Sequence, residues 1–179
     1  MNTFMSETNK RIEHLEREQF KSQQYSRRDS VEISGIPADV SGEVIRIYNE
    51  AAVTVHDKQL GNMDIQACHR IGKKVKVICK FVNRKFAIQG LINGKNLKGK
   101  SLYAASGGVF INISFCPEFG RLNYLVRKAK SNGTIFRWKV RNGTTSIQLK
   151  KDDVFEEISH INDLTRLNLH DPGHVEEGS

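Results

Sequence analysis

Cysteine, proline, tryptophan and long apolar runs are all scarce in this sequence. The cysteines Cys68, Cys79 and Cys116 form no CxxC pair and lack the ligand spacing of a zinc site, so we expect reduced thiols, no metal and no other cofactor. No run approaches the roughly 18 apolar residues of a membrane span. Residues 1–17 also lack the apolar core of a secretory signal. These absences predict an intracellular protein, in the cytoplasm, the nucleus or both, with no membrane association.

Acidic residues are almost missing from residues 70–151, which hold 19 lysines and arginines and one acid, Glu118. The whole chain has a net charge of +8, so the remaining residues are net acidic. Charge segregated in this way attracts polyanions, and neutralising phosphates releases their counterions, which makes nucleic acid the leading candidate partner. The shortage of carboxylates disfavours a metal-dependent nuclease. Because GxSxG, HExxH and P-loop motifs are also missing, we predict that the protein is not an enzyme.

Residues 1–27 are polar and favour a helix. The apolar residues Met5, Ile12 and Leu15 fall on heptad positions, but the other heptad positions are polar. A coiled coil needs a sustained apolar seam over three or four heptads. The pattern therefore fits equally well with the end of a longer coiled coil and with a solvated helix.

Residues 28–115 carry alternating and helical patterns in the order strand, helix, strand, strand, helix, strand. This βαββαβ order predicts a ferredoxin-like domain of the type found in RNA-recognition modules. The first strand has no aromatic residue and the third has only Phe81, on its apolar face, so we do not expect bases to stack on this sheet. The expected strands are 31–36, 63–71, 75–82 and 109–115, and the expected helices are 44–55, capped by Ser41, and 84–92.

Residues 116–166 predict a second, smaller α+β domain made of a helix, a hairpin and another helix. The first helix begins at Pro117, and Asn142-Gly143 between two β-rich runs predicts a hairpin turn. We expect Asp152 or Asp153 to cap a last short helix that contains Val154, Phe155 and Ile158. Residues 167–179 are predicted to be a disordered tail.

Most of the candidate nucleic-acid-binding residues are basic side chains of this second domain. In the predicted hairpin, alternation places Arg137, Lys139 and Arg141 on one face and Phe136, Trp138 and Val140 on the other, where Trp138 is expected to join the core. On the helix we expect Arg121, Arg127 and Lys128 to share one flank, so that helix and hairpin form one basic wall. The remaining candidates are Lys130 on the same helix, and Lys80 and Arg84 in the first domain.

Several segments together resemble the first open reading frame protein of LINE-type retrotransposons and the related baculovirus few-polyhedra (FP) proteins. The segments are Tyr25–Pro37, Ala67–Gly72, Leu122–Lys130 and Trp138–Gly143, and the similarity covers about residues 10–165. The resemblance implies a coiled-coil oligomer, an RNA-recognition-like domain and a small carboxy-terminal domain that bind single-stranded nucleic acid as a chaperone in a ribonucleoprotein. It also places the family's paired basic residues on Arg127 and Lys128, and its basic hairpin residues on Arg137 and Lys139.

These observations lead to two hypotheses. The first is a sequence-tolerant binder of single-stranded RNA or DNA that contacts the backbone of the strand and is a chaperone-like part of a retrotransposon ribonucleoprotein. The alternative is a protein–protein interaction module of the few-polyhedra type, whose basic surface is incidental. In either case the amino-terminal helix is the expected site of self-association.

Overall fold

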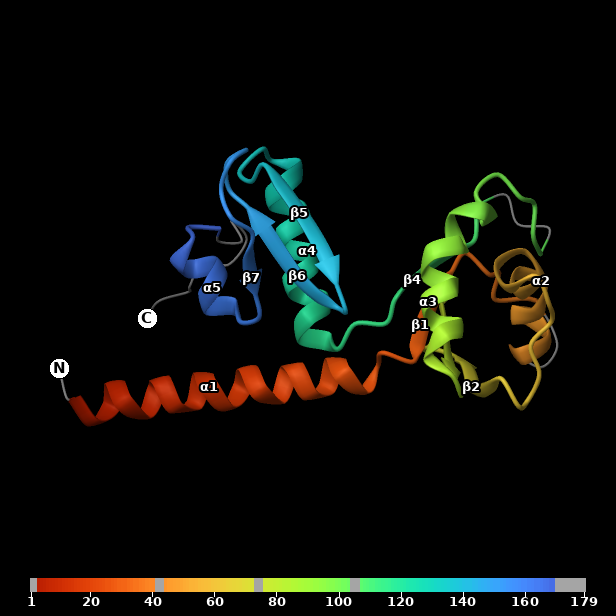
Figure 1. Cartoon of the computed structure of the whole chain (residues 1–179), viewed down its shortest axis with the longest axis horizontal. Coiled ribbons are helices and arrows are strands. Elements are labelled where there is room, and N and C mark those ends of the chain that lie inside the picture. The colour runs from red at the N-terminus through yellow and green to blue at the C-terminus, as the bar shows by residue number, and fades with distance from the viewer. Residues whose placement is uncertain (1–2, 41–43, 73–75, 104–106, 170–179) are drawn as a thin grey trace. The chain divides into compact units, whose positions relative to one another are not determined.

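The computed structural model describes residues 3–40, 44–72, 76–103 and 107–169. The fold is mixed α+β, with a long amino-terminal helix and two antiparallel sheets (Figure 1). The chain divides into two compact units: a central unit, residues 26–114, and a terminal unit made of residues 1–25 and 115–179. Among the described residues, no helix combines the length and the apolar character that crossing a membrane requires. The expected cap at Ser41 and most of the expected disordered tail lie outside the described residues.

The central unit contains the strands and helices expected for this region. Its four antiparallel strands lie in the order β2-β3-β1-β4, so the first and third strands of the unit are neighbours at the centre of the sheet. The elements are β1 (Ser30–Ser34), α2 (Val44–His56), β2 (Ile65–Arg70), β3 (Lys76–Phe81), α3 (Arg84–Asn93), the 3-10 helix η1 (Gly94–Leu97) and β4 (Phe110–Ile113).

The core of the central unit lies between the sheet and its helices, because alternate strand residues point to one face. Val31, Ile33 and Phe81 are buried there with Tyr48 of α2 and Phe86 of α3. Phe81 is thus a core residue, as its pattern predicts, and does not lie on the open face.

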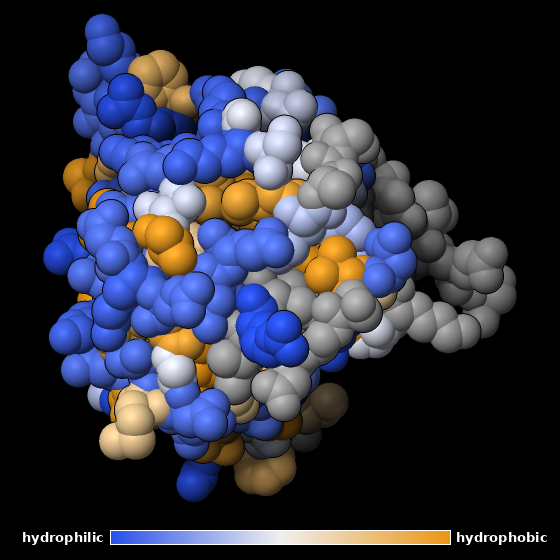
Figure 2. Space-filling view, turned by 90° about the vertical axis from the view of Figure 1, so that its right-hand side faces the viewer, coloured by the Kyte–Doolittle hydropathy of each residue, from blue (hydrophilic) through white to orange (hydrophobic). Residues whose placement is uncertain are grey.

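Figure 2 shows one side of the molecule, the side on which α2 lies in Figure 1, as a mainly hydrophilic surface with scattered apolar patches.

The terminal unit combines the amino-terminal helix with the carboxy-terminal residues. Its helix α4 covers one face of a sheet with strand order β5-β6-β7, and Figure 1 shows this helix behind β5 and β6. The turn between β5 and β6 has positive φ at Asn142 (52°) and at Gly143 (79°), as the Asn-Gly pair predicts. The elements are α1 (Thr3–Ser26), α4 (Pro117–Ser131), β5 (Arg137–Arg141), β6 (Thr144–Gln148), β7 (Glu156–Ile158) and α5 (Ile161–Arg166).

The expected short helix around Val154 and Phe155 is wrong. Residues 156–158 instead form β7, which pairs with β6, and the helix α5 begins only at Ile161. The cap of α5 is His160, whose Nδ1 accepts a hydrogen bond from the backbone N–H of Asn162, while Asp163 accepts from the N–H of His160. Pairing with β6 outweighs the local preference of this acidic segment, because the ladder also buries Ile158.

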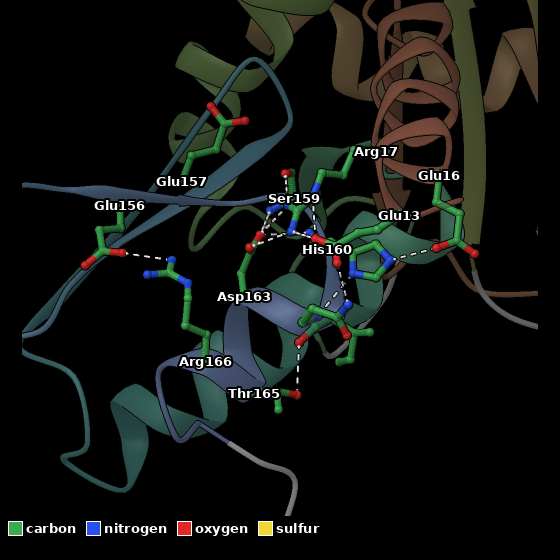
Figure 3. A network of polar contacts seen from close by, with 12 residues as sticks. Glu13, Glu16, Arg17, Glu156, Glu157, Ser159, His160, Asp163, Thr165 and Arg166 are labelled. Atoms are coloured by element: carbon green, nitrogen blue, oxygen red, sulfur yellow. Dashed lines mark hydrogen bonds and ion pairs between the residues drawn. The ribbon is translucent and has the colours of Figure 1, made fainter. Parts of the chain in front are cut away.

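Helix α1 packs against the rest of the terminal unit, so it is not simply a solvated helix. Arg17 donates from both terminal nitrogens to Asp163, at 2.8 Å each, and also to the hydroxyl of Ser159 (Figure 3). His160 Nε2 lies 3.0 Å from a carboxylate oxygen of Glu16, and the ring of Phe20 stacks on the ring of His160. A network of partly buried polar bonds and one aromatic contact therefore connects α1 with the segment around α5.

Electrostatics strengthen this contact between α1 and α5. Burial by itself would raise the pKa of Asp163, but hydrogen bonds from Arg17 and from the backbone N–H groups of Ser159 and His160 bring it below the ordinary value. The pKa of Glu13 is lowered as well, by hydrogen bonds from Arg17 and Asn162. Both carboxylates are thus held in their charged form by partners on the facing segment or on α1 itself.

Candidate nucleic-acid interface

The basic residues of β5 lie on the open face of the terminal sheet. Arg137, Lys139 and Arg141 are exposed, whereas the intervening Trp138 and Val140 are half-buried on the face that α4 covers. The predicted alternation is therefore present, and Trp138 packs against the core as expected. Successive cations on one strand face are about 7 Å apart, since the rise is roughly 3.4 Å per residue.

The middle cation of this row, Lys139, has neighbours on the same face. Its Nζ lies 3.8 Å from the centroid of the Phe155 ring, which fixes the ammonium over an aromatic surface. The register Lys139–Ser146–Glu157 across the three strands places one acid on this face as well. Glu157 also lies 3.6 Å from Lys21 of α1, and both side chains are about half exposed. The open face is therefore basic along β5 and mixed in charge along β7.

One aromatic ring joins a cation of the helix to a cation of the hairpin. Phe136 precedes β5 and is 39% exposed. The Lys130 ammonium lies 5.8 Å from its ring centroid and the Arg137 guanidinium carbon lies 5.6 Å from it. Lys130 also donates a 2.6 Å hydrogen bond to the Phe136 carbonyl. We define Phe136, Lys130 and Arg137 as the edge cluster.

Sequence reasoning grouped Phe136 with Trp138 on the apolar face, but the Phe136 ring is 39% exposed and does not join the hydrophobic core as Trp138 does. The strand ladder begins only at Arg137, so the alternation does not extend back to Phe136. Backbone hydrogen bonds from the Phe136 N–H to the carbonyls of Gln148 and Leu149 mark the irregular start of the strand. The alternation over residues 136–141 hides this shift, because Phe136 fits the same apolar positions as Trp138 and Val140.

The expected single basic wall of helix and hairpin does not form. The buried side of α4 faces the sheet through residues such as Leu122 and Val126, whereas the three β5 cations lie on the opposite face of that sheet. At 100° per residue, Lys128 lies about 20° from Arg121 around the helix axis, but Arg127 lies about 120° away. The basic residues of α4 are thus divided between two flanks of the helix.

The other basic residues of α4 lie near an exposed aromatic ring. Arg121 and Arg127 are exposed and Lys128 is half-buried. Tyr124, three residues from Arg121 and Arg127, is 61% exposed. Helical spacing places Tyr124 between Arg121 and Lys128 on one stripe. This stripe carries two cations and an aromatic ring.

The candidates of the central unit, Lys80 and Arg84, differ from those of the hairpin. Lys80 is half-buried on the open face of the β2-β3-β1-β4 sheet, and Arg84 is exposed at the first turn of α3. Lys76, on the same face as Lys80, forms a 2.6 Å ion pair with Glu32. Part of the positive charge of this face is thus neutralised within the unit.

Phe110 of β4 is an exposed aromatic residue that sequence reasoning missed. It is 55% exposed on the open face of the central sheet, opposite Ser34 of β1 in the strand register. Asn112, two residues further along β4, donates a 3.3 Å hydrogen bond to the Ser34 hydroxyl. The alternation of Val109, Ile111 and Ile113 already indicates that residue 110 points to the other face.

The described part of the chain contains no group of three or more His, Cys, Asp or Glu side chains that could hold a metal ion. No protein-family model matches the chain, and no curated protein matches it. The candidate interface therefore rests on geometry and charge alone.

Proposed function

We propose that the protein binds single-stranded RNA or DNA without strong sequence preference. The observation that carries the proposal is the row Arg137, Lys139 and Arg141, which turns three cations outward along one exposed strand. A strand that follows this row exchanges counterions for lysine and arginine contacts at each phosphate. Such contacts position the backbone and carry no base information, which explains why sequence preference should be weak.

Exposed aromatic rings beside cations support the same proposal. The edge cluster presents the Phe136 ring next to two cations, and the α4 stripe presents the Tyr124 ring next to Arg121 and Lys128. Single-strand binders combine a basic path with rings on which bases stack, and stacking tolerates every base because each has a π-face. Cations already close to a ring add an attraction for phosphate at the same place.

The fold of the central unit is proposed to be RNA-recognition-like. Its strand order β2-β3-β1-β4 and its two helices are what a split βαβ arrangement requires. The sequence resemblance to LINE-type first open reading frame proteins points the same way, and we propose a chaperone-like role in a retrotransposon ribonucleoprotein on that basis. Because Phe81 is buried, this domain would contact a strand through residues other than the usual aromatic pair.

The test is fluorescence anisotropy with a labelled RNA of about 30 nucleotides, long enough for more than one typical site. Four contacts, from Lys130 and the three β5 cations, predict a slope of log K against log salt near −2.8, at about −0.7 per phosphate on single strands. The double variant R137E/K139E should weaken binding at least about tenfold and reduce the slope by about 1.4. The same titration with DNA of the same sequence shows which of the two strands binds more tightly.

The matched control is K95E/K98E, which makes the same change of charge at two exposed lysines of the central unit. If binding follows net charge alone, both double variants will lose affinity equally, and the proposed interface is then wrong. A slope near zero for the wild-type protein would refute nucleic-acid binding itself. Far-UV circular dichroism of each variant establishes that its secondary structure is retained.

A second candidate function, association with another protein or with a second copy of this chain, is favoured by one feature of α1. The exposed apolar residues Phe4, Met5, Ile12 and Leu15 lie within about 100° around the helix axis. This stripe differs from the side that carries Arg17 and Phe20 and contacts the terminal unit. Light scattering of wild type and of I12E/L15E tests the idea. A fall in mass supports self-association through α1, and an unchanged mass contradicts it.

A further inference from the structure

Cys68 and Cys79 are brought directly opposite each other by the pairing of β2 with β3. Cys79 is buried in the core of the central unit, and Cys68 is half-buried and packs against the same core. The two side chains therefore point to the same inner face of the sheet. Ten residues separate them in the sequence, so only the strand register reveals that they are neighbours.

The ladder around this pair fixes its geometry further. The N–H of Ile71 donates to the carbonyl of Lys76 at 3.0 Å, which makes 71 and 76 a hydrogen-bonded pair. Such pairs alternate along an antiparallel ladder, so 69 and 78 are hydrogen-bonded and Cys68 and Cys79 are a non-hydrogen-bonded pair. Opposite Cα atoms in such pairs are about 4.5 Å apart. This is inside the range of about 4.4–6.8 Å that a disulfide spans.

We propose that Cys68 and Cys79 are a reversible oxidation site, at which a low-molecular-weight disulfide such as glutathione disulfide converts the two thiols into an intramolecular disulfide across β2 and β3. Cys68, as its thiolate, attacks one sulfur of the oxidant, forms a mixed disulfide and releases one small thiol. Cys79 then loses its proton and attacks the Cys68 sulfur, which releases the second small thiol. Two protein thiols are oxidised and one disulfide is reduced to two thiols.

The order of attack follows from position. Strand β2 is at the edge of the sheet and Cys68 is half-buried, whereas Cys79 lies on the inner strand β3 with no exposed surface. The hydrogen bond with Cys68 and burial both raise the pKa of the Cys79 thiol, so it is the weaker first nucleophile. Because the pair is close to the short limit of disulfide spans, the bond should be easily reduced again.

The experiment treats the full chain with glutathione disulfide, quenches with acid, and counts the remaining thiols with a maleimide reagent. We expect the count to fall from three to one and to return to three with dithiothreitol. Tryptic mapping should link residues 59–70 to residues 77–80, two peptides that only a disulfide can join. The matched variant C116S, altered in the other unit, should fall from two thiols to none.

The result depends on no variant being folded, because the wild-type protein gives both the thiol count and the peptide map. In C79S, Cys68 should stop at the mixed disulfide, since the second thiol is missing. Three thiols that persist under conditions that fully oxidise dithiothreitol would overturn the proposal. A stable mixed disulfide on wild-type Cys68, or a link to Cys116, would overturn it equally.

Discussion

The two units each contain an antiparallel sheet covered by helices on one face, but their open faces carry charge in different ways. In the central unit, Lys76 is paired with Glu32 at 2.6 Å, and the half-buried Ile78 lies beside Glu32 in the register. In the terminal unit, β5 turns Arg137, Lys139 and Arg141 outward. The acid of that face, Glu157, lies 3.6 Å from Lys21 of α1. We therefore expect the pairing of each cation in the fold, rather than the density of basic residues along the sequence, to determine which face binds nucleic acid.

The units also differ in how the chain builds them. The central unit is one continuous segment, whereas the terminal unit needs α1 from the amino-terminal end and α5 from the other end of the described chain. The contact between Arg17 and Asp163 spans 146 residues. The face that we propose to bind nucleic acid therefore belongs to the unit that contains this long-range ion pair.

The largest expected effect is the loss of that ion pair. In D163N the Arg17 guanidinium keeps its partly buried position without the carboxylate, and removing one partner of a buried pair costs about 3 kcal/mol. Urea unfolding followed by the fluorescence of Trp138, the one tryptophan of the chain, measures this in the terminal unit. The control R166A removes an exposed pair with Glu156 and should cost less than about 1 kcal/mol. Equal losses in D163N and R166A would show that the Arg17–Asp163 pair stabilises the unit no more than an exposed ion pair does.

Acid should lower the free energy of unfolding of the terminal unit, because protonation of Asp163 and Glu13 removes the charges that contact Arg17. The pKa of Asp163 lies below its ordinary value of 3.8 and that of Glu13 below 4.5, so both groups hold fewer protons folded than unfolded. Their stabilisation is fully present above about pH 5 and is lost as the pH falls through the folded pKa values. The urea midpoint of the wild-type protein should therefore fall between pH 5 and pH 3. The fall should be smaller in D163N, and an identical pH profile would show that protonation of Asp163 does not cause the loss of stability in acid.

Removing an exposed aromatic ring from each unit compares how much the two units contribute to nucleic-acid affinity. In F136A the nucleic acid loses a stacking surface beside two cations, and anisotropy should show a loss of about 1–2 kcal/mol, or roughly 5- to 30-fold. F136L retains the apolar volume without the π-face and should lose nearly as much. F110A removes a ring that is more exposed, 55% against 39%, but lies on the central sheet, where Glu32 offsets the nearby Lys76. Its loss should therefore be smaller. A larger loss in F110A would transfer the main contact to the central unit.

Local patterns predicted most of the secondary structure because the strands alternate regularly and the turns use residues suited to positive φ. The hairpin at Asn142-Gly143 is an example, since both residues adopt φ above 50°. Sequence reasoning missed β7 and the start of α5, because residues 156–158 gain their strand form only from pairing with β6. It missed the outward ring of Phe136 because a strand's first paired residue depends on its partner strand.

The long-range features had no local signal at all. A lone arginine at position 17 does not indicate a carboxylate at position 163, and two cysteines eleven positions apart do not indicate a shared register. The candidate cations of β5 were predictable because alternation is a local property. Their separation from Arg121 and Lys128 was not, since it depends on which face of the sheet α4 covers.

The smallest expected effect, that of K76M, tests the main lesson of the comparison. Lys76 is 45% exposed and its pair with Glu32 is near the surface, so its removal should change stability by at most about 1 kcal/mol. Its charge is already offset, so RNA affinity should change less than twofold and the salt slope should remain the same. R137M is the matched variant on the terminal sheet and should reduce the slope by about 0.7. If K76M reduces the slope as much as R137M does, a lysine that is paired with a neighbouring acid still contacts phosphate. Ion pairing would then not distinguish the two faces.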